Sequence, residues 1–185
     1  LYLSLLLSFA GINLIFFFKI YFVLAVVFIL FNYKKLRKIF NNENIILFFL
    51  FLLIVLSIFS YLAQNLRLES DGHMWLEKVL IFYNGYDIQA VKEVPSHPEY
   101  PHLGSYIWAF FWKNSILNLE YFGRYFQPYF YVLSIFLIIN NLSFNNKKIK
   151  ILLILFLILI SFEAYLFGGY QEYLIFTTII VAIRY

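Results

Sequence analysis

The chain has 185 residues, of which 63% are hydrophobic, 23% aromatic and only 13% charged, with a formal net charge of +4. Soluble domains are about half apolar and about a quarter charged, so a soluble fold of this length could not bury this much Phe, Leu and Ile. The cations cluster beside hydrophobic runs, which is typical of membrane orientation and not of a nucleic-acid-binding surface, and the absence of cysteine excludes disulfides and thiolate metal sites.

Long runs without charge predict transmembrane helices, because the strands of a membrane barrel would alternate apolar and polar residues. We therefore expect an all-α fold, a polytopic transmembrane helical bundle with a long extracytoplasmic loop that contains short interfacial helices. Residues 1–63 would form N-terminal transmembrane helices, residues 64–121 the loop, and residues 122–185 further transmembrane helices. Because the chain begins without Met and ends inside an apolar run, we expect it to be part of a longer protein.

The first of these segments is almost entirely apolar. Residues 1–33 are longer than one span needs at about 1.5 Å per residue. We predict the end of one helix, a tight turn near Gly11–Asn13 and a second helix to about Tyr33, the alternative being a single tilted helix that tolerates Lys19. A short basic polar loop follows over residues 34–44, and residues 45–63 carry no charge and have the length of a span.

The long loop concentrates the polar chemistry of the chain. It holds seven of the ten acidic residues, all three histidines, all three tryptophans and three of the four prolines. Within it, the pattern predicts an interfacial helix from Ser70, which can cap it, to Tyr83, with Asn84-Gly85 as the stop. Prolines at every third position from 95 to 101 predict an extended, polyproline-like strap, which leads into a short helix from Leu103 to Trp112.

Three further spans are predicted after the loop, at residues 122–142, 151–168 and 173–185. Between them lie a basic loop at residues 145–150 and a two-glycine turn at residues 168–172.

The density of Lys and Arg predicts which loops face the cytoplasm. Residues 34–44 carry four such cations and residues 145–150 carry three, so both short loops are expected inside. The long loop and the 168–172 turn then emerge together on the outer side. This topology places Asp71 and Glu172 in the same compartment.

Several short motifs occur in an order that resembles a known family. They are Glu69-Ser-Asp71, a helix with Trp75 and Lys78, the strap His97-Pro-Glu-Tyr-Pro101 leading to Leu103, and Arg124 at the start of a span. This order resembles the first extracytoplasmic loop of the GT-C superfamily of membrane glycosyltransferases, most closely the bacterial members related to the dolichyl-phosphate-mannose mannosyltransferases. The turn Gly169-Tyr-Gln-Glu172 resembles a Gly-Tyr-Ala-Asp stretch in some of these proteins, with Glu in place of the usual Asp. The resemblance covers residues 64–185.

The resemblance implies an inverting glycosyltransferase of the hexosyltransferase type in the bacterial inner membrane, with no cofactor that can be read from the sequence. Its donor would be a polyprenyl-phosphate-linked sugar and its acceptor a glycan, lipid or protein outside the cytoplasm. Membrane lipids would surround it, and nucleic acid is not an expected partner. Asp71 or Glu69 would act as general base on the acceptor hydroxyl. Lys78 and Arg124 would hold the lipid phosphate, and the other predicted substrate-binding residues are His97, Tyr100 and Glu172.

The same residues also have plain structural interpretations. Asp71 can cap its helix, Glu69 and Glu172 can be solvated acids, and Arg124 can reach the lipid headgroups. A divalent metal ion is an alternative cofactor, although no pair of histidines has the spacing typical of zinc sites. The alternative functions are a transporter or flippase of lipid-linked glycans, which would place charges or broken helices near mid-membrane, and a non-catalytic membrane subunit.

Overall fold

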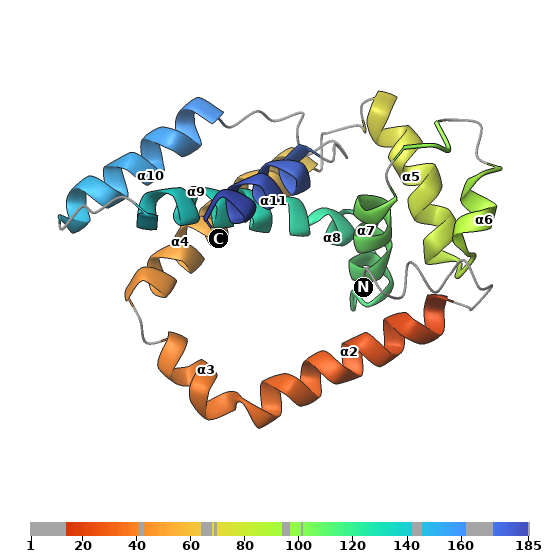
Figure 1. The fold of residues 1–185 in the computed structure, drawn as a ribbon, viewed down its shortest axis with the longest axis horizontal. Coiled ribbons are helices and arrows are strands. Elements are labelled where there is room, and N and C mark those ends of the chain that lie inside the picture. The colour runs from red at the N-terminus through yellow and green to blue at the C-terminus, as the bar shows by residue number, and fades with distance from the viewer. Residues whose placement is uncertain are drawn as a thin grey trace.

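The computed structural model describes residues 14–40, 43–63, 68, 70–93, 97–100, 102–141, 146–161 and 172–184. Within these residues all regular secondary structure is helical, as Figure 1 shows, which confirms the all-α fold class. In chain order the helices are α2 (Leu14–Phe31), α3 (Tyr33–Phe40), α4 (Glu43–Ala63), α5 (Ser70–Tyr83), α6 (Ile88–Val91), α7 (Leu103–Lys113), α8 (Glu120–Arg124), α9 (Phe126–Asn141), α10 (Lys147–Ser161) and α11 (Glu172–Arg184).

One helical stretch in the described part of the chain is long and apolar enough to cross a bilayer. It runs over Glu120–Ile139, through α8 and most of α9. Shorter apolar helical stretches lie at Ile15–Phe31 in α2 and Ile45–Ile58 in α4. A membrane protein is therefore supported by length and composition, while the polytopic bundle stays a prediction.

The N-terminal helices differ from the sequence-based expectation at one point. Helix α2 covers residues 14–31, as both the two-helix and the single-helix interpretations of residues 1–33 predict, and the predicted turn near Gly11–Asn13 lies outside the described residues. The predicted basic loop at residues 34–44 is wrong, because most of it forms α3 and the start of α4. Asn32 separates α2 from α3, and its Nδ2 atom donates to the Phe28 carbonyl at 3.0 Å, which helps to end α2.

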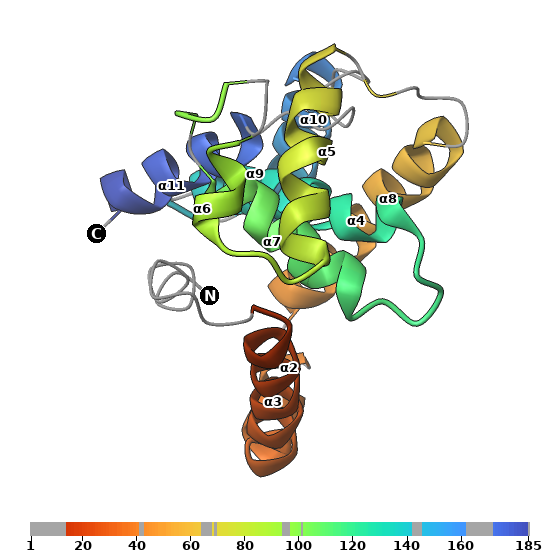
Figure 2. The same ribbon diagram turned by 90° about the vertical axis from the view of Figure 1, so that its right-hand side faces the viewer.

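Two hydrophobic clusters divide the interior. The first packs α5, α6 and α7 together with Phe18 of α2, around the fully buried Trp108 and Tyr106. The second packs α4 against α9 and α10, around Val55 and Val132. Figure 2 shows the loop helices gathered above α2 and α3, which extend away from them. The first cluster therefore belongs to the loop predicted from the sequence, and the second to the predicted spans.

Helices α9 and α11 are joined by a buried polar contact. The hydroxyl oxygens of Ser134 and Thr177 lie 2.6 Å apart, and Thr177 also donates to the Phe130 carbonyl at 3.0 Å. Both side chains are almost completely buried. In an apolar environment a polar group without a partner is costly, so these hydrogen bonds specify how α11 lies on α9.

The helix predicted from Ser70 to Tyr83 is present with the same bounds as α5. It ends as the Asn84-Gly85 signal predicts: Gly85 has a φ of 88°, and the amides of Gly85 and Tyr86 donate to the carbonyls of Phe82 and Ile81. This pair of hydrogen bonds defines a Schellman ending, which requires the left-handed backbone that glycine adopts without strain.

At Gly123, α8 lies very close to Trp108 of α7. A Cβ atom at Gly123 would lie 2.7 Å from the Trp108 carbonyl oxygen and 2.9 Å from the Trp108 Nε1 atom. Gly123→Ala is therefore expected to lower the free energy of unfolding by about 1–3 kcal/mol, the usual cost of an overpacked interior. Thermal unfolding of the detergent-solubilised protein measures this, and Gly123→Val should cost more than Gly123→Ala. Equal stability of all three proteins would contradict the close contact.

Candidate functional site

Lys78 lies in a cage that α5 forms with the chain at residues 97–100. Its side chain is 1% exposed, and its Nζ atom donates to the carbonyl oxygens of His97, at 2.5 Å, and of Tyr100, at 3.4 Å. The same atom lies 5.1 Å from the centre of the Trp75 ring and 5.6 Å from that of Tyr100. Trp75 is on the same face because it lies one helical turn before Lys78. Burial lowers the pKa of Lys78, and the nearby carboxylate of Glu99 partly opposes this effect.

The segment that closes this cage is a tight turn. His97 has a φ of 47°, and the Tyr100 amide donates to the His97 carbonyl at 3.1 Å. The two rings stack with their centres 4.5 Å apart and an interplanar angle of 13°. The predicted extended strap is therefore wrong for residues 97–100, because a polyproline-type helix has no internal hydrogen bond and keeps φ negative. Residues 94–96 and Pro101 lie outside the described residues.

Glu99 projects from this turn into solvent beside His97. Its Oε1 atom lies 3.1 Å from the His97 Nδ1 atom, and both side chains are about half exposed or more. A backbone hydrogen bond, followed by the hydrogen bond with His97, lowers the pKa of Glu99. The turn therefore presents an ionised carboxylate at its surface while its carbonyls hold Lys78 inside.

Three of the predicted substrate-binding residues thus come together, namely Lys78, His97 and Tyr100. Asp71 lies in the first turn of α5, seven positions before Lys78, but its side chain is outside the described part of the structure, as is all of Glu69. Glu172 is the first residue of α11, and its side chain is likewise not described. The catalytic role of Asp71 or Glu69 and the placement of Glu172 beside them therefore stay predictions.

Arg124, the remaining predicted binding residue, forms a second polar cluster with Glu120 and Trp108. Its Nε and Nη2 atoms each lie 2.9 Å from a carboxylate oxygen of Glu120, one helical turn earlier on α8. The guanidinium also lies over the Trp108 ring, 5.7 Å from its centre. The Arg124 side chain is only 4% exposed and that of Glu120 23%. Glu120 is not among the residues predicted from the sequence, although its i,i+4 spacing from Arg124 is the signal of a helical ion pair.

His102 is the N-cap residue of α7. Burial, and then the charge of Lys78, lower the pKa of His102. Its ring meets the Phe82 ring at 6.5 Å in an edge-to-face arrangement. Among the described residues, no three histidine, aspartate or glutamate side chains are grouped so that they could hold a metal ion.

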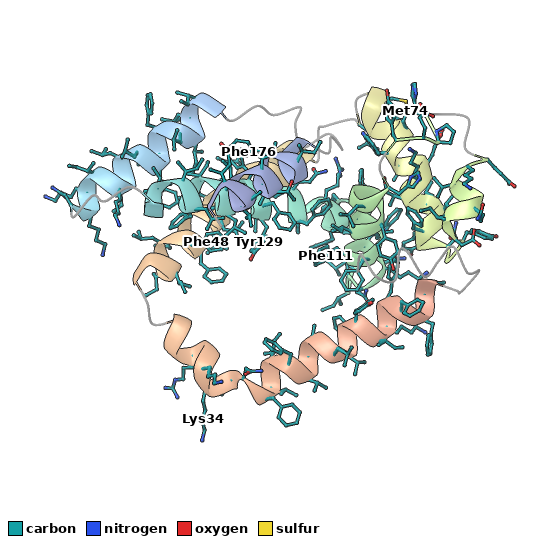
Figure 3. All side chains as sticks on the ribbon, in the orientation of Figure 1. Lys34, Phe48, Met74, Phe111, Tyr129 and Phe176 are labelled. Carbon is teal, nitrogen blue, oxygen red and sulfur yellow. The ribbon has the colours of Figure 1, made fainter. Side chains whose placement is uncertain are left out.

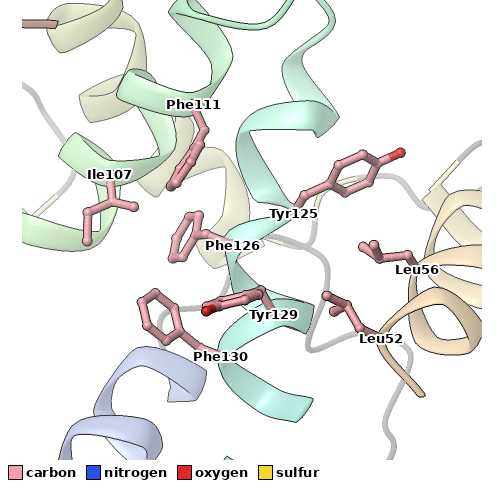
Figure 4. A pocket seen from close by; sticks show the side chains of 8 residues that line it. All are labelled: Leu52, Leu56, Ile107, Phe111, Tyr125, Phe126, Tyr129 and Phe130. Atoms are coloured by element: carbon pink, nitrogen blue, oxygen red, sulfur yellow. The ribbon is translucent and has the colours of Figure 1, made fainter. Parts of the chain in front are cut away.

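An apolar pocket lies where α7 of the loop meets α4 and α9, and Tyr125, the residue after Arg124, lines it. Its volume is about 430 Å³, within the range typical of small-molecule sites. Figure 4 shows the side chains that surround it, which come from α4, α7, the α8–α9 junction and α9: Leu52, Leu56, Ile107, Phe111, Tyr125, Phe126, Tyr129 and Phe130. All of these side chains are aliphatic or aromatic, so the pocket suits a hydrocarbon ligand.

Helix α7 connects the two polar clusters with the pocket. The Ser105 hydroxyl donates to the Trp75 carbonyl at 3.4 Å, which holds α7 against α5. Trp108, one turn further along α7, lies against Arg124. Ile107 and Phe111, also on α7, line the pocket. A polar surface and an apolar pocket therefore adjoin a single buried helix.

Comparison with known proteins finds no matching family model, no matching curated protein and no matching solved structure. The resemblance to the membrane glycosyltransferases therefore rests on short sequence motifs alone.

Proposed function

We propose that this chain is the active-site part of a multi-pass membrane glycosyltransferase in the bacterial inner membrane. It would transfer a sugar from a polyprenyl-phosphate donor to an acceptor on the extracytoplasmic side. The observation that carries this proposal is the arrangement around α7, where polar clusters adjoin an apolar pocket. A lipid-linked sugar has the same two parts, a polar head and a hydrocarbon chain.

The reaction needs a general base, a cation near the phosphate and an apolar site for the polyprenyl chain of the donor. Asp71 would accept the proton of the acceptor hydroxyl while the oxygen of that hydroxyl forms a bond to the anomeric carbon of the sugar. The bond from that carbon to the phosphate oxygen breaks on the opposite face, and the electron pair leaves with the polyprenyl phosphate. Positive charge near the phosphate favours this step because negative charge grows there, which is the role proposed for Arg124 and Lys78.

Both cations already have protein partners, and this limits how they would act. Lys78 is held by two carbonyls and two aromatic rings, while Arg124 is paired with Glu120. The direct partners of Lys78 are neutral, so its positive charge can act on the phosphate over a distance where water is excluded. The charge of Arg124 is offset by Glu120, so Arg124 would act on the phosphate only if the phosphate replaced that carboxylate as its partner. The cage of Lys78 also fixes the turn at residues 97–100, where Glu99, Tyr100 and the His97 ring are exposed to a polar ligand.

The pocket gives the sharpest test of this function. Leu56→Trp would fill part of the pocket, so the KM for a long-chain polyprenyl-phosphate sugar should rise at least about ten-fold, since each buried methylene is worth about 0.8 kcal/mol. The measurement is transfer of labelled sugar by the protein in vesicles. Leu53→Trp is the matched control: Leu53 is 59% exposed on the same helix and does not line the pocket.

Each outcome of this experiment has a clear meaning. No transfer from any lipid-linked sugar by the unmodified protein would refute the proposed function. Transfer with the same KM in Leu56→Trp and Leu53→Trp would refute the role of the pocket in donor binding but not the glycosyltransferase activity. A rise in KM in Leu56→Trp that disappears with a short-chain donor would support both the proposed function and the role of the pocket.

A further inference from the structure

Helix α3 has two chemically different faces. It carries four cations and no acid in eight residues. At about 100° per residue, its cationic positions fall within an arc of about 160° and its apolar positions within the opposite arc of about 120°. The cationic positions are 34, 35, 37 and 38, and the apolar positions are 33, 36, 39 and 40. This separation of faces is typical of helices that lie in the plane of a membrane surface.

The position of α3 in the chain matches such a surface. It directly follows α2, whose 18 residues span about 27 Å, close to the thickness of about 30 Å of the hydrocarbon core. The last turns of α2 expose apolar side chains, among them Leu30 at 70% and Phe31 at 86%. The polar boundary therefore falls at Asn32, and α3 begins at the next residue, Tyr33. Figures 2 and 3 show α2 and α3 extending away from the loop helices, with Lys34 directed outward.

The charges on α3 indicate the partner. Lys34, Lys35 and Arg37 are all exposed, and Tyr33 on the apolar side is 59% exposed. The first acidic residue after them is Glu43, at the start of α4. Anionic lipid headgroups attract juxtamembrane cations, and each cation near the surface changes the affinity about five-fold.

We infer that α3 is an interfacial helix that binds anionic phospholipids of the cytoplasmic leaflet, with Lys34, Lys35 and Arg37 on the headgroups and Tyr33 toward the acyl chains. This rests on the membrane topology of the proposed function but not on the sugar-transfer reaction. The cytoplasmic end of α2 is thereby held at a defined depth, which positions the helix whose Phe18 packs into the core of the loop.

Energy transfer in vesicles tests this inference. The chain has no cysteine, so Phe31→Cys, at a side chain that is 86% exposed at the end of α2, gives a single site for a donor dye beside α3. Energy transfer from this dye to trace acceptor-labelled phosphatidylglycerol is compared with transfer to acceptor-labelled phosphatidylcholine. Transfer to phosphatidylglycerol should be the greater and should fall at high salt. Lys34→Gln, Lys35→Gln and Arg37→Gln together should remove the preference, a change in affinity of about a hundred-fold at about five-fold per cation. Exchanging Lys35 and Leu36, which keeps the charge but mixes the faces, should weaken it.

Equal energy transfer to both lipids in the labelled protein without further substitutions would overturn the inference. An unchanged preference for phosphatidylglycerol in the triple variant would also overturn it. A preference that is as strong after the exchange of Lys35 and Leu36 as before it would also overturn the inference, because charge alone would then suffice. Carbonate extraction separates this result from a failure of the topology. If the chain is not retained in the membrane, the proposed function fails as well, whereas a retained chain that transfers sugar without a lipid preference refutes only the role of α3.

Discussion

Asp71→Asn is expected to lower the rate of sugar transfer by about 10²–10⁴-fold, the usual contribution of a general base. Asparagine keeps the size of the side chain and its ability to cap a helix, but it cannot accept the proton of the acceptor hydroxyl. Insertion and folding should therefore be preserved. Single-turnover transfer from a saturating lipid-linked donor is the measurement, because it reports the chemical step and not product release.

Asp87 supplies a matched control within the same loop. Its Oδ1 atom accepts from the amides of Gln89 and Ala90, at 2.9 and 3.1 Å, and so caps α6. Asn caps helices about as well as Asp, so Asp87→Asn, with the same change in charge, should leave transfer unchanged. Full activity of Asp71→Asn would exclude its role as the base, and an equal loss in both variants would point to the charge of the loop instead.

Arg124→Gln is expected to be the most destabilising single change among the described polar residues. It would leave the half-buried carboxylate of Glu120 without its ion-pair partner and remove the cation from the Trp108 ring. Breaking a buried ion pair from one side typically costs about 3–5 kcal/mol. Unfolding of the purified protein in mixed micelles by SDS measures the loss.

A double-mutant cycle separates the pair from its surroundings. Glu120→Gln combined with Arg124→Gln should be more stable than Arg124→Gln alone, because two neutral amides leave no buried charge behind. Additive losses in the two single variants would show that the two side chains do not stabilise each other. The expected result is a coupling of about 1 kcal/mol or more.

The sequence predicts two helices of the loop, α5 and α7, because their signals are local, and it does not predict the four-residue helix α6. The bounds of α5 follow from the apolar pattern and from the Asn84-Gly85 stop, whose hydrogen bonds are present. The helix predicted from Leu103 to Trp112 is α7, one residue longer. The uncharged run at residues 45–63 lies in α4.

The features that the sequence did not predict depend on contacts between distant segments. Lysine is rarely fully buried, so the enclosure of Lys78 follows only from the turn that brings Tyr100 over Trp75. The prolines near that turn favoured an extended strap, but packing on α5 favours the positive φ of His97. The pocket combines side chains of three helices far apart in the sequence. The high charge of residues 34–38 favours a loop, but the same residues have the helical periodicity of α3.

The burial of α7 has an evolutionary consequence. The stretch Gly104–Ala109 is buried throughout, with one side toward α5, another toward Arg124 and a third toward the pocket. A substitution in this stretch is therefore pleiotropic: it perturbs the polar and the lipophilic compartments in the same step. Changes of acceptor or carrier-chain specificity are therefore expected at residues outside α7 that line only one of the two sites, while Gly104–Ala109 stays constant.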